Sequence, residues 1–417
     1  MTAEILHEEI IRTLKAATDP QLVDELLSRL KRSAGIEDDI LQSQDRRGDS
    51  KQLREVLLVE QEHFDRLITM CEQKLPPDEQ GTIFLRLAEV FKTYGELGRA
   101  EQVYSQMLKR SGGKQAKSQV AEAYLRRGEI FSLRGDWKRS ASDLNRSKKL
   151  FLELKDRHAI GRVENILGAA YAERGRLKLA EKYFSHALRE FDRTPRAPMA
   201  GVAYMNLGIV FNIEGMYDKA LTQYKRAQSS FESTGDVKRL AELHHNIGMS
   251  YLFKGKYKEA NGEFDVSYSF SSPANSVSLM GLSNLGKATA RFYMNDLPVA
   301  LQLARRAIEA FTNCEDRLSL ADAYKVKGMI HRDMESYEEA ETYLHTSLRL
   351  NAELGNKLNL GETYFEIGVL ENRRKDPKKA IHAFQKGKAC FQKIGAREEL
   401  RKTIEQLNYL KGSNSGS

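Results

Sequence analysis

The stretch AYMNLGIVFNIEGMYDKALTQYKRAQ, residues 203–228, decides the fold. A turn at Gly215 divides it into two segments, and each segment has apolar side chains at helical spacing. Gly208 in the first segment and Ala220 in the second would let two helix backbones approach closely, and Tyr224 would fill the space beside them. The stretch therefore predicts a helical hairpin that is closed by contacts between small residues and large neighbours.

This hairpin recurs every forty residues along most of the chain. A single hairpin of this kind cannot bury its apolar face alone, so consecutive hairpins must stack on one another. The sequence therefore predicts an all-α repeat array. The small residues of the repeat are Ala100, Ser140, Ala180, Ala220, Ala260, Ala300, Ala340 and Ala380, and the glycines twelve residues before them are Gly128, Gly168, Gly208, Gly248, Gly328 and Gly368.

The sixth unit departs from this register. Its glycine, Gly286, precedes Ala300 by fourteen residues instead of twelve, and Ala304 stands where other units have a large side chain. We expect this unit to be locally distorted, either as a packing variant or as a bend that serves a partner.

Residues 203–228 and the related stretch VENILGAAYAERGRLKLAEKYFSHAL, residues 163–188, resemble tetratricopeptide repeats. The resemblance covers roughly residues 82–395, and the long period is similar to the extended repeats of kinesin light chains and of the Leu-Gly-Asn scaffold proteins. It implies an all-α fold, a right-handed α-α superhelix or solenoid. HEAT arrays have repeats of similar length, but the offset of twelve from glycine to alanine favours the tetratricopeptide interpretation.

Four regions are predicted along the chain. Residues 1–78 form an N-terminal helical region with amphipathic helices over 4–17, 19–33 and 52–74 and a polar loop over 34–50. An array of about eight hairpins spans 79–395, a capping helix spans 396–411, and 412–417 form a disordered tail. The N-terminal region and the capping helix would limit self-association through the exposed ends of the array, which is otherwise plausible.

No catalytic or cofactor-binding pattern occurs in the sequence. His244 and His245 are adjacent, so they point about 100° apart on a helix, and neither has a His or acidic partner four residues away. The cysteines Cys71, Cys314 and Cys390 are too far apart for a metal or disulfide pattern. We therefore expect a non-enzyme without cofactors, and we expect it to be cytoplasmic because no signal peptide or membrane span is evident.

The resemblance implies that the first helix of each unit lines an inner groove that binds a partner peptide. The groove positions of the family lie six, three and two residues before the glycine and one, four and five after it. Asparagine amides both donate and accept hydrogen bonds, which suits a peptide backbone. The residues carried over as candidate peptide-binding residues are Arg126, Asn165, Asn206, Asn212, His245, Asn246, Asn284, Lys287, Arg291, Lys325, Arg332 and Arg373.

These residues suggest a scaffold or adaptor that binds a protein or peptide partner, with a slight preference for an acidic one. The alternative is a ligand-responsive regulator, because three helices before a repeat array resemble the layout of bacterial peptide-pheromone receptors. Nucleic-acid binding is the weakest hypothesis, since the 66 Lys and Arg are interleaved with 58 Asp and Glu.

Overall fold

The structure is a computed structural model that describes residues 3–17, 19–21, 23–25, 27, 68–69, 73–110, 116–192, 197–394 and 396–414. The regular secondary structure of these residues is entirely α-helical. The chain divides into two compact units, Met1–Arg196 and Ala197–Ser417. Of the expected N-terminal helices and loop, the greater part of 19–33 and 52–74 and all of 34–50 lie outside the described residues.

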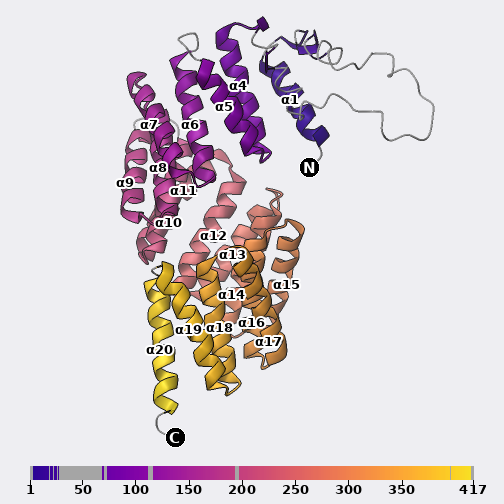
Figure 1. Cartoon of the computed structure of the whole chain (residues 1–417), viewed down its shortest axis with the longest axis vertical. Helices are drawn as coiled ribbons and strands as arrows, with labels where there is room; N and C mark the ends of the chain where they lie inside the picture. The colour runs from indigo at the N-terminus through magenta and orange to yellow at the C-terminus, as the bar shows by residue number, and fades with distance from the viewer. Residues whose placement is uncertain are drawn as a thin grey trace, which may run out of the picture. The chain divides into compact units, whose positions relative to one another are not determined.

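Within its described residues, unit 1 contains a terminal helix and three helical hairpins, in which consecutive helices pack as antiparallel pairs (Figure 1). The terminal helix is α1 (Ala3–Ala17). The hairpins are α4 (Pro77–Thr93) with α5 (Leu97–Arg110), α6 (Lys117–Leu133) with α7 (Trp137–Glu153), and α8 (Arg157–Glu173) with α9 (Leu177–Phe191).

The described part of unit 2 contains five further hairpins and a final single helix. The hairpins are α10 (Ala197–Ile213) with α11 (Tyr217–Thr234), α12 (Val237–Phe253) with α13 (Tyr257–Ser271), α14 (Val277–Tyr293) with α15 (Leu297–Asn313), α16 (Arg317–Asp333) with α17 (Tyr337–Glu353), and α18 (Lys357–Arg373) with α19 (Pro377–Ile394). The final helix is α20 (Arg397–Asn414), which extends into the predicted tail: residues 412–414 are helical, and 415–417 lie outside the described residues.

Short turns set the helix boundaries. Asp156, Asp236 and Asp316 each cap a first helix by accepting a hydrogen bond from the backbone N–H three residues later. Gly215 has a φ of 74° between the two helices of its hairpin, a conformation that glycine adopts without steric cost. The forty-residue period therefore includes its own start and stop signals.

The predicted contact between a glycine and a large residue is confirmed. A Cβ atom added to Gly208 would lie 2.4 Å from the ring of Tyr224, and one added to Gly248 would lie 2.7 Å from the ring of Phe264. The small residues at the eight repeat positions, including Ala220 and Ala260, are buried. Small residues on one helix thus make room for aromatic rings from the other.

A second glycine column lies seven residues before the first, and the sequence pattern did not reveal it. A Cβ atom on Gly161 would lie 2.6 Å from the ring of Phe191, and Gly281 faces Phe311 at the same distance. Gly201 and Gly361 contact Phe231 and Phe391 in the same way. The hairpins α8–α9, α10–α11 and α18–α19 are therefore each closed at two levels by a ring that lies on a glycine, and α14–α15 is closed in this way at one level.

The expected distortion of the sixth unit is not observed. Helix α14 begins forty residues after α12, and α15 begins forty residues after α13, so the helix register is unbroken. Ala288 occupies the position of Gly248. Gly286 instead receives the ring of Phe264 from the preceding hairpin, and a Cβ atom added to it would lie 2.5 Å from that ring. In this unit the glycine stands two residues earlier on the helix, while the helix itself keeps the forty-residue register.

Single helices pack on the ends of the array in each unit. Ile10 and Leu14 of α1 are buried with Ile83 and Leu87 of α4. In unit 2, Leu407 and Leu410 of α20 are buried against Phe384 and Ala380 of α19. Both helices cover apolar surface that would otherwise face water.

Candidate functional site

The first helices of the hairpins form a continuous surface in each unit. In unit 1, α4 contacts α6 and α6 contacts α8; in unit 2, α10, α12, α14, α16 and α18 contact one another in order. Within the described residues, the second helices contact mainly first helices. Stacked hairpins whose first helices lie closer together curve toward that side, so we call this surface the inner face.

Ion pairs cover the inner face of α16 and α18. The Lys325 ammonium group lies 3.2 Å from Asp322 and also pairs with Glu362. Arg332, which is 7% exposed, pairs with Asp333 at 2.8 Å and with Glu366. These two predicted binding cations are therefore neutralised by carboxylates of the same and the adjacent first helix.

The balance of forces at Lys325 shows how firmly it is paired. Burial lowers the pKa of this ammonium group, but Glu362 and Asp322 outweigh burial and raise the pKa well above its ordinary value. At Arg332 the same competition, burial against Glu366 and Asp333, also ends with a raised pKa. Both side chains remain charged and engaged in the array.

A similar network covers the inner face of unit 1. Arg126 lies 2.8 Å from Glu122 and 3.6 Å from Glu129, and Lys92 lies 2.7 Å from Glu129. Arg162 approaches Glu122 at 2.7 Å. Because carboxylates match the cations here, this surface offers little net attraction for an acidic peptide.

The inner face of α10, α12 and α14 is different, because it carries few charges apart from the pair of Arg239 and Glu242 on α12, which lie 3.1 Å apart. On α12, the positions equivalent to Lys325 and Arg332 of α16 are occupied by His245 and Leu252. At the same two positions α14 carries Leu285 and Phe292. Amide, imidazole and apolar groups therefore replace charges in the middle of the array.

The predicted asparagines fall into two groups. The side-chain oxygen of Asn212 accepts a hydrogen bond of 2.8 Å from the Ser250 hydroxyl group on α12, so Asn212 joins two helices. Asn165 and Asn206 also interact with other groups of the chain. The half-buried Asn246 amide makes no side-chain hydrogen bond to any part of the chain that the structure describes, and it can bind a ligand at no cost to existing contacts.

His245 lies beside Asn246 with its ring against Phe264, at 5.5 Å between ring centroids. Its Nδ1 atom is buried without a hydrogen-bond partner among the described residues. Burial lowers the pKa of His245 to about 4, so the imidazole is neutral at pH 7. A neutral imidazole can donate or accept one hydrogen bond to a ligand.

An exposed apolar rim runs along one edge of this surface. Ile213, Phe253 and Tyr293, the last residues of α10, α12 and α14, are 61%, 54% and 49% exposed. One tyrosine of α11 and one of α13 support the rim. Tyr217 stacks on Phe253 with 6.0 Å between ring centroids, and Tyr257 stacks on Tyr293 with 5.0 Å. Exposed apolar groups that recur at one end of successive helices favour an interaction surface.

The register of α14 corrects three of the predicted positions. Gly286 stands two residues before Ala288, the position equivalent to Gly248. Residues whose groove positions were counted from Gly286 therefore do not lie at the inner face. Lys287 lies 2.5 Å from Asp265 of α13, and Arg291 donates to Asn261 of α13 at 3.1 Å, so both face the second helix of the preceding hairpin.

The remaining two predicted residues have different settings. Asn284 is the third residue affected by the register, and it is buried. It occupies the position of His244, whose Nδ1 atom lies 2.7 Å from Glu263 of α13. Arg373 is exposed and makes no ion pair within the described ranges.

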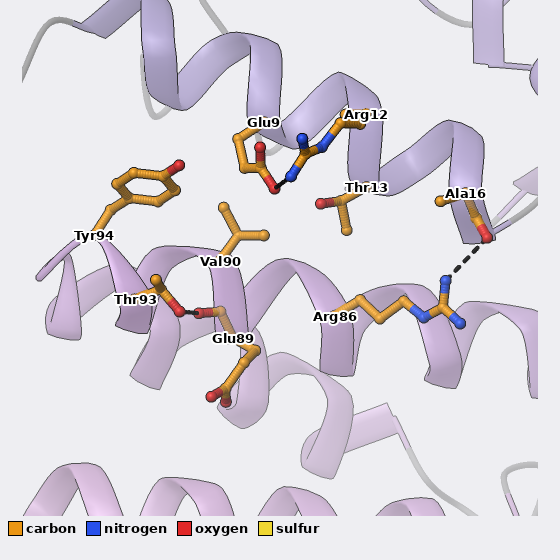
Figure 2. A pocket seen from close by; sticks show the side chains of 9 residues that line it. All are labelled: Glu9, Arg12, Thr13, Ala16, Arg86, Glu89, Val90, Thr93 and Tyr94. Atoms are coloured by element: carbon orange, nitrogen blue, oxygen red, sulfur yellow. Dashed lines mark hydrogen bonds and ion pairs between the residues drawn. The ribbon is translucent and has the colours of Figure 1, made fainter. Parts of the chain in front are cut away.

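An open pocket between α1 and α4 was not predicted from the sequence (Figure 2). Its volume is about 590 Å³, and it is lined by Glu9, Arg12, Thr13, Ala16, Arg86, Glu89, Val90, Thr93 and Tyr94. Arg86 donates a hydrogen bond of 2.9 Å to the Ala16 carbonyl oxygen, and Arg12 pairs with Glu9 at 2.7 Å. The polar groups are largely satisfied by each other, and no sequence pattern shows that α1 docks here.

Comparison with known proteins identifies the repeat. A model of the tetratricopeptide repeat family matches residues 199–268 and 319–393. These two stretches of the chain are tetratricopeptide repeats. No curated protein is similar enough in sequence to count as a relative.

Solved structures share the fold of the tetratricopeptide array. The apo form of the quorum sensor NprR from B. thuringiensis is 17% identical, with a TM-score of 0.63 over 88% of this chain and 97% of that chain. A Rap protein complexed with competence and sporulation factor is 11% identical, with a TM-score of 0.56 over 81% and 99%. A STAND protein with a tetratricopeptide repeat sensor from Pyrococcus horikoshii is 14% identical, with a TM-score of 0.58 over 82% and 54%.

These similarities confirm the predicted repeat family and fold class. The likeness to kinesin light chains and Leu-Gly-Asn scaffolds stays a prediction. Within the described ranges of this chain, no helix is long and apolar enough to cross a membrane, and no cluster of His, Cys, Asp or Glu could hold a metal ion.

Proposed function

We propose that this chain is a non-catalytic interaction scaffold that binds an extended peptide segment of a partner on the inner face of α10, α12 and α14. The single observation that carries the proposal is the free amide of Asn246 on a surface with few charges and an exposed apolar rim. Solved structures with this fold include a Rap protein complexed with competence and sporulation factor, which supports binding of a separate partner molecule.

The surface favours a particular ligand chemistry. The Asn246 amide can donate to a peptide carbonyl and accept from a peptide N–H at once. Phe253 and Tyr293 offer aromatic contacts for apolar side chains. Because Lys325 and Arg332 are already paired, we infer an uncharged, apolar-rich segment here, which differs from the acidic peptide expected from the sequence.

A peptide selection tests this proposal. Dodecapeptides are selected from a random display library on the immobilised full chain, and the dissociation constant of the best one is measured by fluorescence anisotropy. We expect Asn246→Ala and Phe253→Ser each to weaken binding about tenfold, which corresponds to about 1.4 kcal/mol. The control is Gln302→Ala, at an exposed position of α15.

The salt dependence gives a second readout. An uncharged ligand predicts an affinity that changes less than about threefold between 50 and 300 mM NaCl, since few charges are screened. The proposal fails if the selected peptides bind the Asn246→Ala and Phe253→Ser variants as tightly as they bind the unaltered chain.

The second candidate function is a ligand-responsive regulator. One observation favours it: α1 is held on the first hairpin by a small apolar cluster and by Arg86, so an N-terminal element is docked on the array. The likeness to the quorum sensor NprR over 97% of its length supports this layout. If it is correct, a selected peptide will change the hydrogen exchange of α1; unchanged exchange of α1 at saturating peptide would count against it.

A further inference from the structure

The two hairpins from α6 to α9 in unit 1 carry a large share of the excess positive charge of the chain. Residues 116–192 contain 17 Lys and Arg against 11 Asp and Glu, an excess of six, whereas the whole chain has 66 against 58, an excess of eight. The inner-face network holds its cations in ion pairs. The excess must therefore lie elsewhere in these two hairpins.

Five of the cations that make no ion pair among the described residues lie on the outward sides of the second helices α7 and α9, and three others, Lys155, Arg174 and Arg176, lie in the turns. Lys138, Arg146 and Lys149 of α7 are exposed, as are Lys182 and Arg189 of α9. None of these five makes an ion pair with any residue that the structure describes. Arg146 lies over a ring, with its guanidinium carbon 5.6 Å from the centroid of Tyr124.

The carboxylates of the same helices are occupied by other cations. Asp143 is buried and held by Arg127 at 2.7 and 3.1 Å, and Glu153 pairs with Lys117 at 2.7 Å. On α9, Glu190 pairs with Arg157 at 3.2 Å, and Glu181 pairs with Lys178 at 3.4 Å. Along α7 and α9, which the structure describes from end to end, no acidic side chain remains to balance the five cations.

The cations are arranged in matching rows. Positions 138, 142, 145, 146 and 149 of α7 correspond, forty residues later, to 178, 182, 185, 186 and 189 of α9, and both helices pack on α8. The α7 row also includes the exposed hydrogen-bond donors Ser142 and Asn145. Within each row, successive positions on the helix face are three or four residues apart, so the row follows one side of the helix.

We propose that these two rows, the outer basic rows, bind an acidic helix of a partner protein. A partner helix lying along a row has the same rise of about 1.5 Å per residue, so carboxylates at positions i, i+4, i+7 and i+11 meet the cations and donors in register. A straight row of two or three charges suits one helix better than the curved phosphate paths of a duplex. The outward positions of both rows contain no Phe, Tyr or Trp on which single-stranded bases could stack.

This proposal is independent of the peptide site on unit 2. It concerns a different surface, a ligand of opposite character and a binding reaction that depends strongly on salt. The acidic partner expected from the sequence would thus bind to the cations on the outer side of unit 1.

The test uses a synthetic 18-residue helical peptide with glutamate at positions 1, 5, 8 and 12, and a matched peptide with glutamine at those positions. Binding to the full chain is measured by fluorescence anisotropy at 50 and 300 mM NaCl. We expect the glutamate peptide to bind, the glutamine peptide to bind at least tenfold more weakly, and the higher salt to weaken binding several-fold.

Two charge-reversal variants localise the binding. Arg146→Glu with Lys149→Glu reverses two cations of the outer basic rows and should weaken glutamate-peptide binding at least tenfold. Arg305→Glu with Arg306→Glu makes the same charge change on the exposed side of α15 and should leave affinity within about twofold. Carbodiimide cross-links of the peptide should map to Lys138, Lys149 and Lys182.

Two results would overturn the proposal. One is equal binding of the glutamate peptide to both variants and to the unaltered chain. The other is a 20-base-pair DNA duplex that binds more tightly than the peptide at the same salt and loses affinity in the Arg146→Glu, Lys149→Glu variant, which would assign the rows to nucleic acid.

Discussion

At the scale of single residues, the packing of glycine against a ring makes the hairpin specific. Gly208 lies so close to Tyr224 that a methyl group cannot be added without moving the ring or the backbone. Gly262 lies within α13, is exposed and has no atom within 4 Å of the added Cβ position. The same residue type therefore has opposite roles at two positions in helices.

Alanine substitutions should separate these roles. We expect Gly208→Ala to lower the free energy of unfolding by about 1–3 kcal/mol, because overpacking outweighs the gain in helix propensity. Gly262→Ala should raise it by up to about 1 kcal/mol, because only the propensity changes. Chemical denaturation measures both, and equal effects of the two substitutions would contradict the packing argument.

His245 gives a prediction for pH. Its pKa is about 4 in the folded protein and about 6.5 in an unfolded chain. Above pH 6.5 both states are neutral and the full stability is present; between pH 6.5 and 4 the unfolded chain takes up the proton and stability falls by up to about 3 kcal/mol. Below pH 4 both states are protonated, and this contribution changes no further.

The variant His245→Asn should lose less stability than the unaltered chain between pH 7 and pH 4.5, as measured by urea denaturation at both values. His345→Asn, at an exposed position of α17, is the control and should follow the unaltered chain. If the stability of the two variants depends on pH in the same way, the assignment of a buried, neutral His245 is wrong.

At the scale of helices, α20 completes the apolar packing of unit 2. Its Leu407 and Leu410 cover Phe384 and Ala380, and its outer side carries Arg401 in ion pairs of 2.7 and 2.6 Å with Glu398 and Glu405. Ending the chain after residue 396 should lower the melting temperature of unit 2 and speed hydrogen exchange first in α18 and α19. Unchanged exchange in both helices would show that α20 does not cap the array.

The helices themselves were largely predictable from the sequence. Repeated glycine, alanine and turn signals at a period of forty residues predict both the hairpins and their boundaries, because each unit repeats the same local chemistry. The exception is α14, where the pattern indicates Gly286 as the equivalent of Gly248. Only the structure shows that Gly286 receives Phe264 of the preceding hairpin.

The candidate site was less predictable for a physical reason. Sequence position indicates which side of a helix a residue occupies, but the partner of a charge lies about 33 to 40 residues away, on the first helix of the next hairpin. Lys325 and Glu362 are one example, and Arg332 and Glu366 are another. The free amide of Asn246 and the bound amide of Asn212 look alike in sequence and differ only in whether the Ser250 hydroxyl group donates to them.

At the scale of the molecule, each unit presents a surface with its own chemistry. In unit 2, the inner face of α10, α12 and α14 carries few charges and has an apolar rim at Ile213, Phe253 and Tyr293. Unit 1 has the outer basic rows on α7 and α9. A scaffold with two such surfaces can bind two partners of different character, one held by apolar contacts and amides and the other by charge.

The most direct test of the proposed peptide site is hydrogen–deuterium exchange of the full chain with and without a peptide selected from the random library. We expect slower exchange in α10, α12 and α14 when the peptide is bound, and loss of that protection in the Asn246→Ala variant. Protection confined to the second helices or to unit 1, with α10, α12 and α14 unchanged, would contradict a binding site on the inner face of unit 2.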